Sequence, residues 1–214
     1  MRLHLASGNA HKAAEFASLA AETGLPVEVV AATGAGGMPA VVEDAGTFLG
    51  NARKKAQALR ARLPASSWVL ADDSGLCVAA LEGGPGVESA YYAGPQGDSA
   101  ANLRKLVETM RGVPAERRQA YFVCVLVVID GHGREHEFEG RCEGTLRERP
   151  AGGAGFGYDP LFVPAGETRT FAELPEATKH ALSHRGRAWA KLAAWLRVRQ
   201  ATEVGSPWHG SPDP

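Results

Sequence analysis

The sequence predicts an α/β fold: an elongated mixed β-sheet flanked by helices, arranged in two lobes with a cleft between them. In its first third, short apolar runs alternate with segments of helical periodicity, which favours parallel strands joined by helices. Further along, the apolar residues 120–129 and the segment 134–142 flank Asp130-Gly131-His132-Gly133, a hairpin turn sequence. A sheet that contains both arrangements is mixed.

The expected elements follow in a regular order. Strands are expected at 3–6, 27–31, 68–71, 76–81, 120–129 and 134–142, and helices at 12–23, 43–63, 98–110 and 175–199. The helices are predicted from apolar residues at helical spacing, and 43–63 is either one long helix or a turn followed by a helix. Residues 1–200 are expected to form one domain. Residues 201–214, rich in Gly, Ser and Pro, are expected to be a disordered tail.

Composition excludes several classes of protein. The 214 residues are 44% hydrophobic and 22% charged, as in an ordinary soluble domain. A net charge of -1 gives no basic field for nucleic acid or an anionic membrane. No signal peptide or membrane span is expected. Cys77, Cys124 and Cys142 are odd in number and scattered, which disfavours a disulfide framework and favours the cytoplasm.

The most informative segment is Ala71-Asp72-Asp73-Ser74-Gly75-Leu76, which lies between two apolar runs. It is expected to be a turn where a strand leaves the core. Carboxylates beside apolar strands need a compensating cation, and Mg²⁺ is a hard cation that takes oxygen ligands and leaves room for phosphates. The alternative is an acidic turn that only caps the strand, since Asp, Ser and Gly are common turn residues.

Four other segments carry candidate chemistry, each with a simpler alternative. Ser7-Gly8-Asn9-Ala10-His11-Lys12 joins a strand to a helix N-terminus, which suits phosphate but is also an ordinary helix cap. Glu43, with Asn51 and Lys55 on one helix face nearby, offers a second metal ligand; the alternative is a helix N-terminal carboxylate at Glu43 and a solvated surface lysine at Lys55.

Gly155-Phe156-Gly157-Tyr158-Asp159-Pro160 offers aromatic faces for a nucleobase, or a tight loop whose aromatic rings fill the core. Lys179-His180-Ala181-Leu182-Ser183-His184-Arg185 offers donors for carbonyl oxygens on a purine edge, or a basic, solvent-facing helix start. Each pattern is weak when considered alone.

Together these segments resemble the inosine triphosphate pyrophosphatase family. The resemblance spans roughly residues 1–198 and rests on ordered motifs at 7–12, 43–56, 71–76, 83–90, 155–160 and 183–186. It implies Mg²⁺-dependent hydrolysis of the deaminated purine nucleotides ITP, dITP and XTP to the monophosphate and pyrophosphate, in a cytoplasmic homodimer that cleanses the nucleotide pool. One departure is Tyr91, where relatives often carry Arg in a Ser-Ala-Arg-Tyr motif.

The resemblance also implies the role of each candidate residue. Asp73 would be the general base, and Glu43 and Asp73 would hold Mg²⁺ with Asp72 close by. The triphosphate would be held by Ser7, Gly8, Asn9, Ala10, His11, Lys12, Lys55 and Ser74. The base would be bound by Phe156, Gly157, Tyr158, Asp159, Lys179, His184 and Arg185.

Three rival functions stay open at this point. One is a related pyrophosphatase for modified pyrimidine or methylated nucleotides, which Ser183-His184-Arg185 disfavours. Another is a nucleotide-binding regulatory protein without turnover, which the carboxylates Glu43, Asp72 and Asp73 disfavour. The third is a phosphotransferase, although neither a P-loop nor a kinase motif is present.

Overall fold

The computed structural model describes residues 1–204 and shows a six-stranded mixed sheet in the order β2-β1-β3-β4-β5-β6. The strands are β1 Arg2–Leu5, β2 Glu28–Ala31, β3 Trp68–Val78, β4 Gln119–Ile129, β5 Glu135–Leu146 and β6 Phe162–Pro164. The helices are α1 Ala10–Glu22, α2 Phe48–Arg60, α3 Ser99–Thr109, α4 Glu176–Leu182 and α5 His184–Val204. β1 pairs in parallel with β2 and β3, whereas β3 to β6 are antiparallel. The predicted mixed α/β sheet is therefore confirmed.

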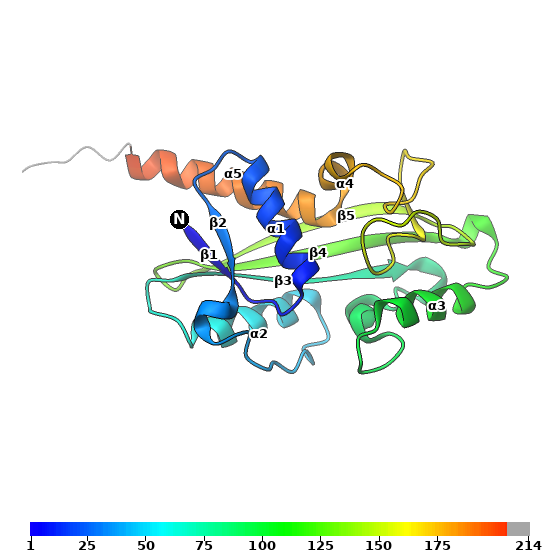
Figure 1. The fold of residues 1–214 in the computed structure, drawn as a ribbon, viewed down its shortest axis with the longest axis horizontal. Helices are drawn as coiled ribbons and strands as arrows, with labels where there is room; N and C mark the ends of the chain where they lie inside the picture. The colour runs from blue at the N-terminus through cyan, green and yellow to red at the C-terminus, as the bar shows by residue number, and fades with distance from the viewer. Residues whose placement is uncertain (205–214) are drawn as a thin grey trace, which may run out of the picture.

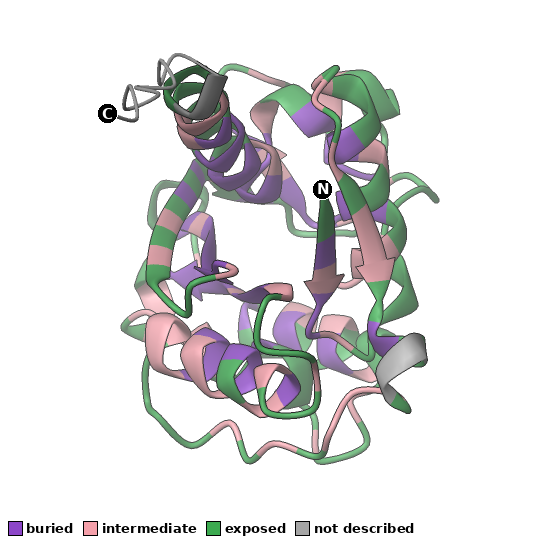
Figure 2. Ribbon diagram, turned by 90° about the vertical axis from the view of Figure 1, so that its left-hand side faces the viewer, coloured by how far each residue is buried: buried purple, intermediate pink, exposed green. Residues whose placement is uncertain are grey.

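The three long strands β3, β4 and β5 run along the molecule (Figure 1) and connect two packed regions. Helices α1 and α5 cover one face of the sheet at the end that holds β1 and β2, and α2 covers the other face. Helix α3 lies toward the opposite end of the long strands. The helices turn their buried residues toward the sheet and their exposed residues outward (Figure 2).

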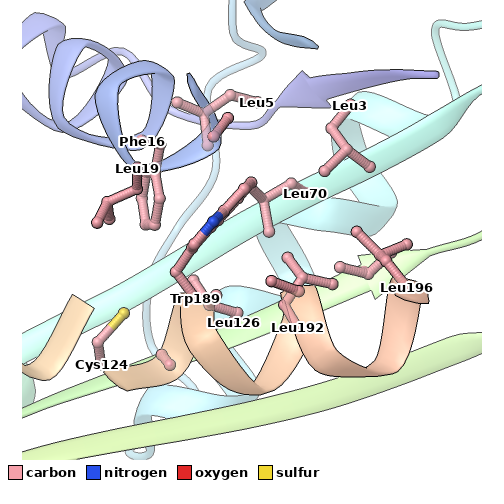
Figure 3. Packing of buried hydrophobic residues seen from close by; sticks show 14 residues of the cluster. Leu3, Leu5, Phe16, Leu19, Leu70, Cys124, Leu126, Trp189, Leu192 and Leu196 are labelled. Carbon is pink, nitrogen blue, oxygen red and sulfur yellow. The ribbon is translucent and has the colours of Figure 1, made fainter. Parts of the chain in front are cut away.

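Separate hydrophobic clusters fill the two regions. In the first, Phe16 of α1 and Trp189 of α5 pack on Leu70 and Leu126 of the sheet (Figure 3). On the opposite face, apolar residues of α2 pack on Val69, which is fully buried. The second region has its own cluster, formed by Leu76, Leu106, Met110, Phe122, Phe162 and Phe171 among others. Two cores joined by long strands give the two lobes that the sequence predicts.

The acidic segment 71–76 is not a turn, so that prediction was wrong. β3 is continuous from Trp68 to Val78 and pairs with β4 along this length. The neighbouring strand β1 ends at Leu5, so the chain turns away while β3 continues. Adjacent residues of a strand point to opposite faces of the sheet. Asp72 and Asp73 consequently face different helices.

Segment 43–63 is a turn followed by α2, which is the second of the two predicted alternatives, and Thr47 is the N-cap. Two other boundaries differ from the prediction. The predicted helix 175–199 is broken at Ser183, whose extended backbone and hydroxyl, which accepts from the Gly186 amide at 3.0 Å, start α5 afresh. Helix α5 extends to Val204, so residues 201–204 are helical, and residues 205–214 of the expected tail lie outside the described residues. No helix of the described chain is long and apolar enough to span a membrane.

Candidate functional site

A cleft of about 490 Å³ opens where β1 ends and β3 continues, a volume typical of small-molecule sites. It collects residues that lie far apart in the sequence. The predicted residues that line it are Ser7, Gly8, Asn9, Lys12, Glu43, Lys55, Asp73, Ser74, Phe156, Gly157, Tyr158, Asp159, His184 and Arg185. Ala10, His11 and Lys179 do not line it. The cleft therefore brings together most of the predicted site residues.

The turn after β1 is shaped by its own side chains. Asn9 caps α1, because its Oδ1 accepts from the amides of His11 at 3.0 Å and Lys12 at 3.2 Å. The Ser7 hydroxyl accepts from the Asn9 amide at 3.1 Å. Asn9 is therefore an ordinary helix cap, as the simpler alternative predicts. The same cap places the start of α1, with the positive end of its helix dipole, toward the cleft.

Asp72 faces the side of the sheet covered by α1 and α5. Its Oδ2 lies 2.7 Å from Lys12 Nζ and 4.0 Å from Arg185 Nε, and it accepts from the Ser74 hydroxyl at 3.3 Å. Asp72 is only 1% exposed, and its burial would raise the pKa. The positive charges of Lys12, Arg185 and Lys55 outweigh that effect and lower the pKa to about 2. Asp72 is therefore a buried, ionised carboxylate that stabilises two cations.

Asp73 faces the opposite side, toward α2. It accepts from Lys55 Nζ at 2.9 Å and from the Asn51 amide at 3.2 Å, and it borders the cleft. Burial raises the pKa of Asp73, while Lys55 and Lys12 oppose that rise. The two neighbouring carboxylates thus differ in basicity. Asp72 is a weak base stabilised by cations, and Asp73 is the more basic group and borders the cleft.

Glu43 completes an oxygen-rich corner beside Asp73. Lys55 Nζ donates to Glu43 Oε2 at 2.8 Å as well as to Asp73, so two carboxylates converge on one cationic position. Among the described residues, no group of three or more His, Cys, Asp or Glu forms a cage for a metal. Two carboxylates with free space beside them fit Mg²⁺, which is typically held by one or two carboxylates with substrate phosphates and water.

The other end of the cleft is built around Phe156. The Phe156 amide donates to Asp159 Oδ2 at 3.0 Å, and Lys179 Nζ donates to the same oxygen at 2.8 Å. Lys179 thus supports the loop through Asp159 from outside the cleft. The His11 ring stacks on Phe156 with centroids 5.4 Å apart and 18° between the planes. Tyr158 is buried in the second lobe, and its hydroxyl donates to the Ser89 carbonyl at 2.8 Å.

The first turn of α5 adds His184 and Arg185. Arg185 donates to Glu15 Oε2 of α1 at 2.9 Å and to the Ser74 hydroxyl of β3 at 3.0 Å. Its guanidinium carbon also lies 5.1 Å from the centre of the Phe156 ring. Arg185 therefore connects the carboxylate end of the cleft to the aromatic end. His184 is buried, and burial together with the charges of Arg185, Lys179 and Lys12 lowers its pKa well below the ordinary value.

Comparisons with known proteins show what the chain is similar to. The model of the Ham1 family matches residues 3–195. The chain is 63% identical over 201 residues to the dITP/XTP pyrophosphatase of Opitutus terrae, covering 92% of this chain and 99% of that protein. It is 46% identical over 198 residues to the protein of that name from Streptomyces coelicolor, covering 92% and 97%.

The chain belongs to the Ham1 family. The solved structure of the Staphylococcus aureus Ham1 protein superposes on it with a TM-score of 0.80 at 33% identity, covering 93% of this chain and 100% of that one. The Ham1 fold is thus shared along nearly the whole chain.

Three residues of this Ham1 chain enter the site without having been predicted. Glu15 is the partner of Arg185, and its only signal in sequence is an acid beside the apolar stripe of α1, one turn after Lys12. Asn51 is expected on the helix face of Lys55, but nothing indicates that it donates to Asp73. Phe122 lines the cleft from β4 and resembles any other core residue of a strand. Tyr91, the departure noted above, is half-exposed and lines the cleft as well.

The pKa of Asp72 predicts how stability depends on pH. Its folded value of about 2 lies below the ordinary 3.8, so its contribution is complete above pH 5 and decreases as the pH falls toward 2. Between pH 6 and pH 3, wild type should lose about 1 kcal/mol of unfolding free energy more than Asp72→Asn does. Urea denaturation of both proteins in metal-free buffer measures the difference. Parallel pH profiles would contradict the assignment.

Proposed function

We propose that this chain is a nucleoside triphosphate pyrophosphatase that hydrolyses the deaminated purine nucleotides ITP, dITP and XTP to the monophosphate and pyrophosphate. The observation that carries the proposal is that one cleft has cations and carboxylates at one end and an aromatic ring with hydrogen-bond donors at the other. A nucleotide is complementary to both ends, because it has an anionic polyphosphate and an aromatic base. Membership of the Ham1 family and the names of the similar proteins support this choice of reaction.

At the carboxylate end, the residues of this chain would hold the triphosphate. Lys12 and Lys55 already balance Asp72 and Asp73, and both line the cleft, where phosphate oxygens would be a second set of partners. The start of α1 adds the positive end of its helix dipole, while the amides of Asn9, His11 and Lys12 already donate to the side chains of Ser7 and Asn9. Asp73 is proposed as the general base, because its carboxylate borders the cleft where the triphosphate would lie and can accept a proton from the water that attacks phosphorus.

Glu43 and Asp73 are proposed to hold Mg²⁺. When bound, the ion would neutralise the polyphosphate and activate water. Lys55 contacts both carboxylates and would then be available to the phosphates. This role is inferred from the oxygen donors and from the family resemblance.

At the aromatic end, Phe156 would stack on the base and the donors of His184 and Arg185 would meet its edge. Hypoxanthine and xanthine carry a carbonyl at position 6, where adenine carries an amino group. A donor placed at that position donates to a carbonyl oxygen and is mismatched with an amino group, and a site of this kind discriminates by orders of magnitude. Guanine carries the same 6-carbonyl, so its exclusion would require a poor fit for its 2-amino group. Asp159 is engaged by Lys179 and the Phe156 amide, so its proposed part in base reading includes shaping the loop.

The same proposal extends to the cellular setting. We infer that the chain acts as a homodimer in the cytoplasm, where it removes deaminated nucleotides before their incorporation into DNA and RNA. It would bind free nucleotides rather than nucleic acid, in agreement with its net charge of -1.

Pyrophosphate release from ITP, XTP, GTP and ATP tests the reaction and the base selectivity together. With Mg²⁺, ITP and XTP should release pyrophosphate with kcat/KM at least about a hundredfold above that of GTP and ATP. Chelation with EDTA should abolish the release. Orthophosphate as the product, or equal activity on all four nucleotides, would refute the proposal.

Asp73→Asn tests the general base. Loss of a general base is expected to lower kcat by about 100- to 10,000-fold. Asp44→Asn is the matched control, because Asp44 is an exposed carboxylate that pairs with Lys54. Steady-state kinetics with ITP, together with circular dichroism to verify folding, give the comparison. Near-normal kcat in folded Asp73→Asn would remove Asp73 from this role.

A further inference from the structure

His184 is held by a ring stack. The Phe122 side chain of β4 lies parallel to the imidazole, with centroids 4.7 Å apart and 11° between the planes. Both residues line the cleft, and both are buried. Stacked aromatic pairs contribute free energy beyond the area that they bury. The stack thus defines the plane of the imidazole at the wall of the cleft.

Hydrogen bonding does not define that plane through Nδ1. The orientation of a histidine is usually set by a hydrogen bond at one ring nitrogen. In His184, Nδ1 is buried and has no hydrogen-bond partner among the described residues. The ring therefore depends on packing for its orientation, and Phe122 provides the parallel contact.

The backbone of His184 is fixed independently. A Cβ added to Gly140 of β5 would lie 2.1 Å from the His184 carbonyl oxygen and 2.3 Å from the Ala188 amide. The first turn of α5 consequently rests directly on the backbone of β5. With the main chain fixed in this way, the remaining freedom of His184 is rotation of its side chain.

Phe122 is itself held rigidly. Phe162 meets its ring edge-on at 4.8 Å, and Phe171 lies 6.1 Å away. Both of these neighbours are fully buried in the second lobe. Since a close-packed aromatic cluster leaves little room for another rotamer, Phe122 presents a fixed surface to His184.

We propose that Phe122 is a positioning residue for base recognition, holding the imidazole of His184 in the orientation in which it meets the purine. This inference rests on the proposed function and adds to it a residue that determines selectivity. Phe122 lies at the aromatic end of the cleft, whereas hydrolysis is assigned to Asp73. Loss of its ring should therefore affect the choice of base more than the rate of turnover.

Three variants test the inference. Phe122→Leu removes the stack, Phe122→Tyr keeps the ring, and Phe138→Leu is a matched loss of a ring in the first lobe, where Phe138 packs on Trp195. In Phe122→Leu, the ratio of kcat/KM for ITP to that for ATP should fall about two- to tenfold, because the donor that meets the 6-carbonyl is no longer held in place. The loss should appear as a higher KM for ITP, with kcat within about twofold of wild type. Phe122→Tyr and Phe138→Leu should keep the wild-type ratio.

A second measurement does not depend on whether the variants fold. In the NMR spectrum of the wild type, the carbon-bound ring protons of His184 should show an upfield ring-current shift from Phe122, with or without nucleotide. Absence of that shift, or an unchanged ITP-to-ATP ratio in folded Phe122→Leu, would overturn the inference while the proposed function stands. A wild type that releases no pyrophosphate from ITP would instead refute the proposed function.

Discussion

Asp72 and Asp73 place two negative charges in the middle of a buried strand, and each charge needs a cation on its own face of the sheet. Lys12 of α1 and Arg185 of α5 lie on one face, and Lys55 of α2 lies on the other. A buried carboxylate without such a partner would cost several kcal/mol. The placement of three helices around β3 is therefore tied to the charges that they balance, as well as to apolar packing.

This charge balance also shapes the cleft. Because β1 is shorter than β3, the cations surround a space instead of a neighbouring strand. Arg185 contacts Ser74 at the carboxylate end of the cleft and Phe156 at the aromatic end, so that the two ends are connected. Glu15 completes it by holding the other side of the Arg185 guanidinium. The cleft is consequently assembled from α1, α5 and β3 together, and its two ends are coupled through Arg185.

Local patterns predicted most of the elements, because apolar periodicity and turn residues act over short distances. The same reasoning placed 71–76 in a turn, since the pairing with β4 that keeps β3 continuous is a long-range interaction. The residues of the cleft were predicted from the ordered motifs of the family resemblance, which carry no information on contacts. Glu15 and Phe122 escaped prediction because their partners, Arg185 and His184, lie more than sixty residues away in the chain. Spatial pairs of this kind have no local signature.

A double-mutant cycle on Lys12 and Asp72 tests the central claim, that paired charges across β3 hold the cleft together. Lys12→Met, Asp72→Asn and the double variant would be compared with wild type by urea denaturation without nucleotide. Each single change should destabilise the fold, Lys12→Met by about 3 kcal/mol because it leaves a buried carboxylate without its nearest partner. The double variant should be more stable than the sum of the singles by at least about 1 kcal/mol. Additive effects would contradict the claim.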